Sequence, residues 1–563
     1  MNKKFSISKK EVKNIFSIFI FASSLLWIFT NLNLHYLSVY APDFQYYKDY
    51  LDYFFQVTND TNREQGLLYF YFVSFILSLN TDIVTNGYFN QVVSDSIQIT
   101  NLILYLFGLS GLYQLLKFKK FESFEILITF TILNFFPQTI NLIATMKPEI
   151  LAFSLLTWTF YLIEQFLESD NLKYLYLSSF SVVLLASSKG TILGMVGLCF
   201  IGLLVINRSK FKNIKIIKLI LFFLLLAIPI FLENYFANQM FLSSHLVQDP
   251  KMQEVADISL LYNINFKDLY MYPFRHFHAN SLFGMIILDT FGDYFMWYAN
   301  NDESAFHYIK KENFQNIWII SHWREFFSSL LTVIFYSSVV YLYIKKKDLK
   351  FYFLLPAYGL LILLLQAYGF PQKNFNKATA ELFKTHYYSF LLLITFAFIA
   401  SIIIKKSKTV GFIILLIVSF NTSFLYGIPA QKSDEYTSYI TEKNKVVSTC
   451  NLNSIFISDF PADGCENKEI FFCYENNPID ELKPKYNNSQ LFESDTRIYY
   501  TFIDDYGNIL EANSLEECNR YLTQEFKVNS TYTQLSRLPF FNVLYFIIFI
   551  VGIVYNKSKI IKL

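Results

Sequence analysis

Three carboxylates stand close together in the stretch Ala41–Phe55, which directly follows the first long apolar run of the chain. They are Asp43, Asp49 and Asp52, and tyrosines and phenylalanines surround them. A carboxylate at bilayer depth is costly unless it faces protein or a water-filled cavity. An ionised carboxylate can accept a proton from an attacking hydroxyl or amine, which is the work of a general base. The plainer alternative is an interfacial helix with solvated acids, and the positions of the other ionisable residues argue against it.

Cationic side chains occupy several other loops that we expect on the same side of the membrane. Fixed cations of this kind stabilise the negative charge that collects on a departing phosphate. Each could also be explained alone, because long basic side chains at helix ends extend toward the interface. The candidate phosphate-binding residues are Lys147, Lys189, Arg275, Lys377, Lys384 and His386. Two acids of the longest of these loops, Asp289 and Asp293, are candidates for contacting a sugar or forming part of a lid.

The composition places the chain in a membrane. Of its 563 residues, 53% are hydrophobic and only 16% are charged, and the mean hydropathy is +0.32. These values exclude an ordinary soluble chain, and many apolar runs reach the roughly 20 residues that cross a bilayer as a helix. The 47 basic residues nearly balance the 45 acidic ones and lie in short clusters between apolar runs, so nothing indicates nucleic acid as a partner.

Lysine-rich clusters set the expected topology, because cytoplasmic loops carry an excess of Lys and Arg. The clusters follow alternate apolar runs, at 117–120, 208–218, 345–347, 405–408 and 557–562. They predict an α-helical polytopic membrane protein with about 12 spans and both termini in the cytoplasm. The apolar stretch Gly66–Asn80 is expected to lie at the interface or to re-enter, since a full crossing would place the later clusters outside. One continuous span is expected from about Phe124 to about Met146.

Four of the five cysteines lie in the polar segment 430–537, namely Cys450, Cys465, Cys473 and Cys518. An even set confined to one soluble module predicts two disulfides in an oxidising, extracytoplasmic compartment, with free thiols as the alternative. The spacing lacks the paired pattern of a zinc site, and three pairings are open. We therefore expect a transmembrane domain over 1–429, an extracytoplasmic disulfide-containing module over 430–537, and a final span with a cytoplasmic tail over 538–563.

Short motifs at the ends of several expected spans carry a family resemblance. They are Pro42-Asp43 with Tyr46-Tyr47, the run from Glu64 to Tyr71, Lys147-Pro148-Glu149, Ser188-Lys189-Gly190-Thr191, and Lys384-Thr385-His386-Tyr387-Tyr388. In this order they resemble the integral-membrane glycosyltransferases of the C class (GT-C), which include the protein O-mannosyltransferases and the lipid A aminoarabinose transferases. Two departures stand out. Phe44 follows Asp43 where the family often has a second acid, and no pair of metal ligands is visible.

The resemblance implies an inverting transfer of a sugar from a polyprenyl-phosphate donor to a lipid, glycan or protein acceptor. The reaction would take place on the extracytoplasmic face of a bacterial inner membrane, among membrane lipids. Asp43 would act as the base, and the cationic residues named above would bind the donor phosphate. A divalent metal cofactor stays open.

Two other classes of protein also stay open. A transporter or flippase of lipid-linked saccharides would have pseudo-symmetric halves with broken helices and ionisable residues in mid-span. We find no convincing internal repeat and few such residues. A polymerase or ligase of surface polysaccharide also has a large outside loop, and an analysis of the products would separate it from a single-sugar transferase.

Overall fold

The computed structural model describes residues 9–35, 44–56, 65–79, 89–207, 213–238, 253–271, 273, 275–278, 280–292, 319–369, 372–373, 383–427, 500–503, 509–512 and 535–560. This part of the chain is mostly helical. Its strands form two short antiparallel pairs, β1 (Gln253–Glu254) with β2 (Gln372–Lys373), and β3 (Tyr500–Ile503) with β4 (Ile509–Ala512).

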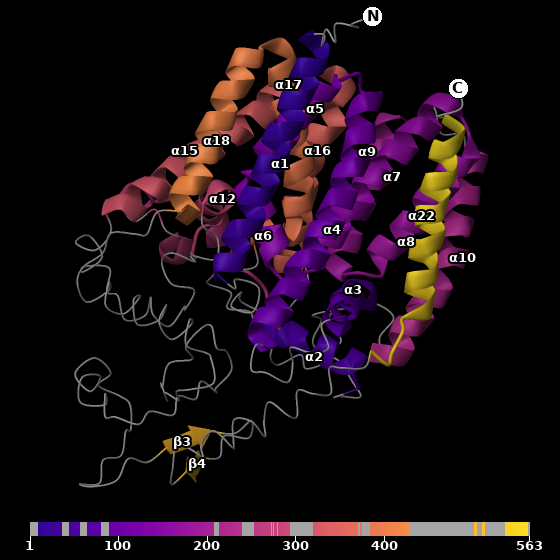
Figure 1. The fold of residues 1–563 in the computed structure, drawn as a ribbon, viewed down its shortest axis with the longest axis horizontal. Helices are drawn as coiled ribbons and strands as arrows, with labels where there is room; N and C mark the ends of the chain where they lie inside the picture. Colours follow the sequence, from indigo (N-terminus) through magenta and orange to yellow (C-terminus); the bar gives the residue numbers. More distant parts are fainter. Residues whose placement is uncertain are drawn as a thin grey trace, which may run out of the picture.

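Long helices form one bundle in which most axes run in a similar direction (Figure 1). Apolar runs adopt this structure because a backbone in lipid must satisfy its own N–H and C=O groups. The helices of the bundle are α1 (Lys9–His35), α4 (Phe89–Phe118), α7 (Glu149–Ser169), α8 (Leu172–Ala186), α9 (Gly190–Ile206), α10 (Asn213–Asn238), α15 (Ile319–Lys345), α16 (Lys350–Gly369), α17 (Ser389–Lys406), α18 (Lys408–Gly427) and α22 (Phe540–Ile560).

Within the described ranges, seven helices are long and apolar enough to cross a membrane, and a bent pair would make an eighth. The seven include α1, α4, α7, α10, α15, α16 and α17. The shorter apolar helices α8, α9, α18 and α22 lie where the sequence predicts further spans. The chain is therefore a multi-pass membrane protein, while the full count of about 12 stays a prediction.

The stretch predicted as a span from about Phe124 to about Met146 forms a bent pair of helices. Helix α5 (Ser123–Asn134) and helix α6 (Pro137–Ala144) meet at an angle of 68°. Pro137 causes the break, because proline has no N–H to donate and its ring clashes with the preceding helical turn. The bend places two buried polar residues of α6, Gln138 and Asn141, in the interior of the bundle.

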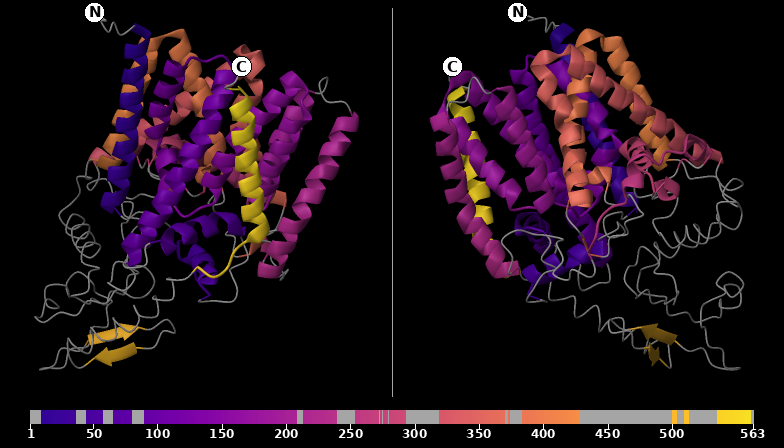
Figure 2. Two further views of the ribbon diagram at one scale, coloured as in Figure 1. Left: turned by 45° about the vertical axis from the view of Figure 1, so that its right-hand side comes forward. Right: turned by 180° about the vertical axis from the view of Figure 1, so that it is seen from behind.

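Two short helices, α2 (Phe44–Phe54) and α3 (Leu67–Ser78), lie together at one end of the bundle (Figures 1 and 2). At 12 residues α3 is too short to cross a bilayer, as the sequence predicts for this stretch. Aromatic contacts join the pair, because the Tyr50 and Phe70 rings stack at 4.1 Å between centroids. The Tyr50 hydroxyl also donates to the Gln65 carbonyl at 3.1 Å.

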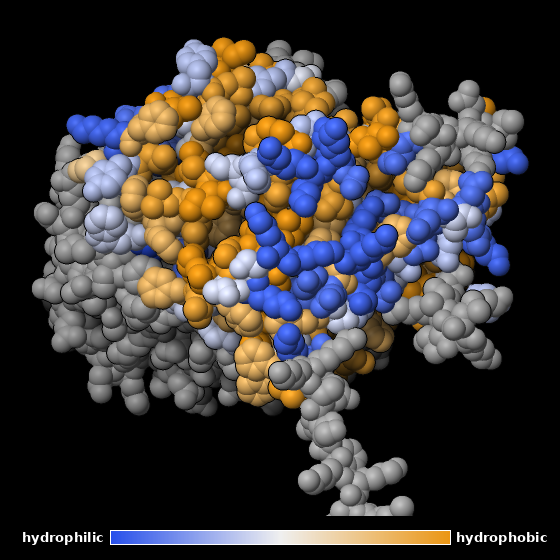
Figure 3. Space-filling view, turned by 90° about the horizontal axis from the view of Figure 1, so that it is seen from above, coloured by the Kyte–Doolittle hydropathy of each residue, from blue (hydrophilic) through white to orange (hydrophobic). Residues whose placement is uncertain are grey.

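The opposite end of the bundle carries lysine clusters that the sequence assigns to the cytoplasm. Helix α1 begins at this end and α22 finishes there (Figure 1). The Lys405 ammonium donates to the Lys120 carbonyl at 2.9 Å, so two clusters distant in sequence are neighbours. Seen from this end, the surface has a broad hydrophilic area beside hydrophobic side chains (Figure 3). The gathering of the clusters at one end agrees with the predicted alternation, and the compartment that this end faces stays a prediction.

Helices α4 and α7 approach each other closely near the centre of the bundle. A Cβ atom at Gly108 would lie 2.6 Å from the Phe153 ring, and one at Gly111 would lie 2.8 Å from Thr157 Oγ1. The Thr157 hydroxyl donates to the Gly108 carbonyl at 2.9 Å. Small residues allow such contacts between membrane helices. The tight packing fixes α7 and therefore the turn at its beginning, which carries Lys147.

Candidate functional site

Two turns and a short 3₁₀ helix bring polar side chains together in the interior at the end that holds α3. The turns join α6 to α7 and α8 to α9, and the 3₁₀ helix is η6 (Thr385–Tyr388), which leads into α17. We define the lysine cluster as the five side chains that meet there, Lys147, Glu149, Lys189, His386 and Tyr387. Four of them, all except Tyr387, are at most 4% exposed.

Short contacts join four members of the lysine cluster in two pairs. Lys147 Nζ lies 2.9 Å from His386 Nε2, and Lys189 Nζ lies 2.8 Å from Glu149 Oε1. An ammonium has only donors, so the imidazole nitrogen that faces Lys147 is the acceptor. A buried charge needs a counter-ion or several hydrogen-bond partners, and Glu149 meets this need for Lys189.

The ring of Tyr387 lies against both ammonium groups. Lys189 Nζ is 4.4 Å from the ring centroid, and Lys147 Nζ is 5.8 Å from it. Cations within about 6 Å of an aromatic face are attracted by its quadrupole. Two further cations, Lys384 and Arg275, are close enough to act electrostatically on His386. The region is therefore cationic overall.

A buried hydrogen-bond network fixes the turn that carries Lys147. Asn101 on α4 donates to the backbone carbonyls of Ile143 at 2.9 Å and Thr145 at 2.8 Å. The Tyr69 hydroxyl on α3 donates in turn to Asn101 Oδ1 at 2.9 Å. This network joins helix α3 to the backbone two residues before Lys147.

A close backbone contact fixes the turn that carries Lys189. The Gly66 N–H donates to the Ser188 carbonyl at 2.7 Å. A Cβ atom at position 66 would lie 1.5 Å from the Ser187 carbonyl oxygen, so only glycine fits without a shift of the backbone. The Ser187 hydroxyl donates to Asn542 Oδ1 of α22 at 3.0 Å. The beginning of α3 and the beginning of α22 thus both touch this turn.

A second ionic contact pairs Arg275 with Asp289. Arg275 belongs to the 3₁₀ helix η4 (Arg275–His278), and Asp289 belongs to α12 (Leu282–Phe291). Arg275 Nε lies 3.0 Å from Asp289 Oδ1, and the Asp289 side chain is wholly buried. Burial raises the pKa of Asp289 to about 6, although the Arg275 guanidinium, the Thr385 N–H and the Lys384 charge all act to lower it.

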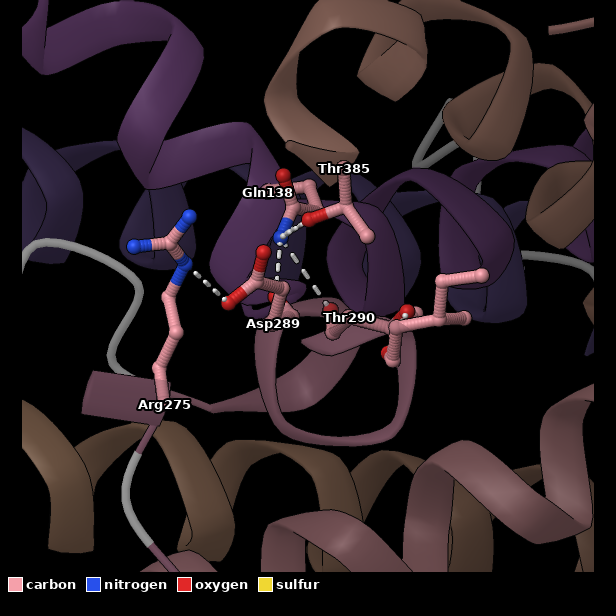
Figure 4. Close-up of polar contacts among 6 residues, drawn as sticks. Gln138, Arg275, Asp289, Thr290 and Thr385 are labelled. Atoms are coloured by element: carbon pink, nitrogen blue, oxygen red, sulfur yellow. Dashed lines mark hydrogen bonds and ion pairs between the residues drawn. The ribbon is translucent and has the colours of Figure 1, made fainter. Parts of the chain in front are cut away.

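Gln138 lies between the Asp289 backbone and Thr385, as Figure 4 shows. Its Nε2 donates to the Asp289 carbonyl at 2.6 Å and lies 3.4 Å from Thr385 Oγ1. Thr385 precedes His386 directly, so one side chain joins α6, α12 and η6. The bend at Pro137 brings Gln138 to this position.

The structure brings together most of the candidate residues that it describes. Lys147, Lys189 and His386 meet in the lysine cluster, and Arg275 pairs with Asp289 beside it. Lys384 is half-buried and acts electrostatically on both groups. Several predicted residues lie outside the described residues, namely Asp43, Lys377, Asp293, Cys450, Cys465, Cys473 and Cys518. The fifth cysteine, Cys199, is a buried free thiol in α9.

The candidate site contains three residues to which the sequence assigns no role. Glu149 stands two residues after Lys147, and a carboxylate at the buried start of a helix is itself a signal. Gln138 directly follows the helix-breaking Pro137 within an apolar run. Tyr387 lies between His386 and Tyr388 in a motif that the sequence already marks. No group of three or more His, Cys, Asp or Glu side chains among the described residues is arranged to hold a metal ion.

One comparison with known proteins finds a match. The model of the dolichyl-phosphate-mannose-protein mannosyltransferase family matches residues 69–232, which include Gln138, Lys147, Glu149 and Lys189. No curated protein and no solved structure matches the chain. The family match confirms the resemblance that the motifs indicate and, with the bundle of apolar helices, supports a membrane glycosyltransferase of the GT-C kind.

Proposed function

We propose that this protein transfers a sugar, with inversion, from a polyprenyl-phosphate donor to an acceptor on the extracytoplasmic face of a bacterial inner membrane. One observation carries the proposal. Two lysines of the family-matched segment, Lys147 and Lys189, hold their ammonium groups in one buried cluster. This cluster lies at the end of the bundle away from the exposed lysine clusters.

The cations would bind the donor phosphate and stabilise it as it leaves. Among the described residues, four cations (Lys147, Lys189, Arg275 and Lys384) and two carboxylates (Glu149 and Asp289) make up this region. An excess of positive charge in a low-dielectric interior suits an anion. Negative charge grows on the polyprenyl phosphate as the sugar–oxygen bond breaks, so preorganised cations lower the barrier. Lys377 is a further candidate for the same role.

Asp43 is the proposed base that takes the acceptor proton. Helix α2 begins at the next residue, Phe44, and packs against α3 through Tyr47 and Phe70, whose ring centroids are 5.5 Å apart. The start of α3 is hydrogen-bonded to the Lys189 turn. These contacts link α2 to the turn that carries Lys189, and this link supports the choice of Asp43 as the base. Asp289 and Asp293 remain candidates for contacting the sugar or forming a lid. The 430–537 module, for which two disulfides are predicted, is a candidate for binding the acceptor or a partner.

A transfer assay with the purified full-length protein in liposomes tests this function. The donors are polyprenyl-phosphate mannose and polyprenyl-phosphate aminoarabinose with a radiolabelled sugar, and the acceptor is a membrane extract of the source cells. We expect labelled product and free polyprenyl phosphate in equal amounts. Movement of a labelled lipid-linked saccharide across the bilayer without transfer would assign the protein to the transporters instead. Products that grow by repeated units would assign it to the polymerases.

A further inference from the structure

A short segment at the beginning of α22 contacts several other parts of the bundle. The segment is 536–542, and α22 itself lies beside α8 and α10 (Figure 1). Its hydrogen bonds reach the last turn of α2, the helix α10, and the turn between α8 and α9 that carries Lys189. The segment lies outside the family-matched residues 69–232. A part of the chain that the family comparison does not cover therefore touches the proposed phosphate site.

The first contact of the segment completes the end of α2. The Phe54 carbonyl accepts hydrogen bonds from the N–H groups of Ser536 at 3.2 Å and Arg537 at 3.3 Å, and from the Ser536 hydroxyl at 3.2 Å. Carbonyls in the last turn of a helix have no partner within that helix, so these donors satisfy one of them. The Arg537 guanidinium also lies 4.2 Å from the centroid of the Tyr53 ring. The segment thus holds the helix that follows Asp43.

The second contact fixes the first turn of α22 on α10. Glu233 Oε2 accepts hydrogen bonds from the N–H groups of Phe541 at 3.2 Å and Asn542 at 3.3 Å. The first N–H groups of a helix lack acceptors within it, and a carboxylate is stabilising there. Asn542 Nδ2 donates to the same oxygen at 3.2 Å. Because an amide nitrogen only donates, this bond orients the amide and turns its oxygen toward α8 and α9.

The third contact reaches the turn that carries Lys189. Asn542 Oδ1 accepts a hydrogen bond from the Ser187 hydroxyl at 3.0 Å. The hydroxyl has one proton, and it shares this proton with the Leu184 carbonyl at 2.9 Å. Asn542 is 0% exposed and Ser187 is 4% exposed. A buried polar group without a partner is costly, so the amide oxygen favours the position of Ser187 in which this bond forms.

The position of Ser187 constrains that of Lys189. Ser188 alone separates the two residues, and its carbonyl accepts the Gly66 N–H at 2.7 Å. Lys189 then pairs with Glu149 at 2.8 Å. Contacts with both α3 and α22 therefore fix the backbone that carries this ammonium. Groups that are held in place before the reaction stabilise charge in the transition state better than groups that must reorient.

We infer that Asn542 is a positioning residue for the sugar transfer, which acts through Ser187 and holds the Lys189 ammonium in place for the donor phosphate. Because the same segment is bonded to α2, it also fixes Lys189 relative to the helix that follows Asp43. The inference rests on the proposed function for the role of Lys189. The alternative is a purely structural contact that stabilises α22 against α8 and leaves the phosphate site unaffected.

A double-mutant cycle tests whether Asn542 acts through Ser187. The variants are Asn542→Ala, Ser187→Ala and the double variant, each as the full-length protein in liposomes with a polyprenyl-phosphate sugar and its acceptor. We expect each single variant to lower kcat about tenfold with a smaller change in KM, because a displaced lysine stabilises the transition state less well. The double variant should fall no further than the single ones. Effects that multiply in the double variant would overturn the inference.

Two control variants separate positioning from packing. Tyr545→Leu removes the contact of the Tyr545 and Phe180 rings, whose centroids are 5.6 Å apart, about one turn further along α22. Ser178→Ala removes a buried hydroxyl that bonds only the Leu175 carbonyl within α8. Both should keep the kcat of the wild type. An equal fall of kcat in Tyr545→Leu would overturn the role of Asn542, and if Asn542→Ala does not fold, a wild-type kcat in Ser187→Ala would do the same.

Hydrogen–deuterium exchange provides a readout besides activity. In Asn542→Ala the peptide that contains 187–191 should exchange about tenfold faster than in the wild type, because the turn has lost a contact, whereas Tyr545→Leu should exchange as the wild type does. Unchanged exchange in Asn542→Ala would overturn the inference. If the wild type transfers sugar from no polyprenyl-phosphate donor, the proposed function fails, and exchange alone decides whether Asn542 holds the turn. If the wild type transfers sugar and Asn542→Ala matches Tyr545→Leu in kcat and exchange, the inference fails and the function remains.

Discussion

Lys189 and Glu149 form an ion pair of 2.8 Å between side chains that are only 4% and 1% exposed. They come from different turns, forty positions apart in the sequence. Separating the two turns would leave each charge buried without its partner, which is strongly unfavourable. The ion pair therefore stabilises the contact between the turns. Glu149 therefore keeps a cation in place inside the membrane domain.

Replacing Glu149 by Gln should destabilise the protein by about 3–5 kcal/mol, because it leaves the Lys189 ammonium without its carboxylate. Thermal unfolding in detergent measures the effect. Glu168→Gln is the matched control, since Glu168 is exposed near the other end of α7, and it should change stability by less than about 0.5 kcal/mol. The double variant Glu149→Gln with Lys189→Met should recover much of the loss. Wild-type unfolding of Glu149→Gln would contradict this account of the pair.

Replacing Asp43 by Asn should lower sugar transfer by about 10²-fold or more if Asp43 is the base, because the amide keeps the shape and cannot take a proton. Binding of the lipid donor should persist. Asp49→Asn is the comparison, as Asp49 lies six residues later on α2. A large loss in Asp49→Asn with a fully active Asp43→Asn would move the role of base to Asp49.

Replacing Lys189 by Ala should act differently from replacing Asp43. The variant removes a cation from the proposed phosphate site, so we expect weaker donor binding as well as slower turnover. Binding of radiolabelled polyprenyl phosphate to the protein in liposomes measures the first effect directly. Lys173→Ala, at the exposed start of α8, should match the wild type in both assays. Unchanged donor binding and turnover in Lys189→Ala would remove this residue from the site.

The stability of the protein should carry a pH dependence that comes from Asp289. Its pKa is about 6 in the folded protein and near 3.9 in an unfolded chain, so the folded state binds this proton more tightly. The stability from this group is fully present below pH ~4 and is lost as the pH rises to ~6. The loss is at most about 3 kcal/mol. Asp289→Asn should lack this slope, whereas the exposed Asp348→Asn should keep it, in thermal unfolding between pH 4.5 and 7.5. Parallel curves for the wild type and Asp289→Asn would disprove the assignment.

Reporter fusions test the predicted sidedness. Fusions after Lys120, Lys347 and Lys408 should report the cytoplasm, because these positions follow the lysine clusters. A fusion after Pro484, within the 430–537 segment, should report the outside. A cytoplasmic signal at Pro484 would overturn the topology and, with it, the side on which the lysine cluster is proposed to act.

Local signals allowed much of the site to be predicted from the sequence. Lys147 and Lys189 stand in short turns between apolar runs, and His386 stands just before one, so their location at one end of a bundle follows from span counting. The shortness of α3, which favours an interfacial or re-entrant helix over a full crossing, follows from the length of its apolar run. These features depend on composition and spacing within a short window.

Partners across long sequence distances could not be predicted in this way. Lys147 contacts His386 and Arg275 contacts Asp289 because of how η6 and α12 pack against α6 and α7, which depends on many side chains at once. The bend of 68° at Pro137 places Gln138 in the site. A hydropathy pattern does not show such a bend and predicts a single span over both helices.

The contact between Gly66 and Ser188 has a consequence for depth. Helix α3 is too short to cross the bilayer, and its side chains Tyr71 and Phe72 are partly exposed. Because position 66 leaves no room for a side chain, α3 and the turn that carries Lys189 behave as one rigid unit. The predicted interfacial position of α3 would therefore also set the depth of the Lys189 ammonium in the membrane.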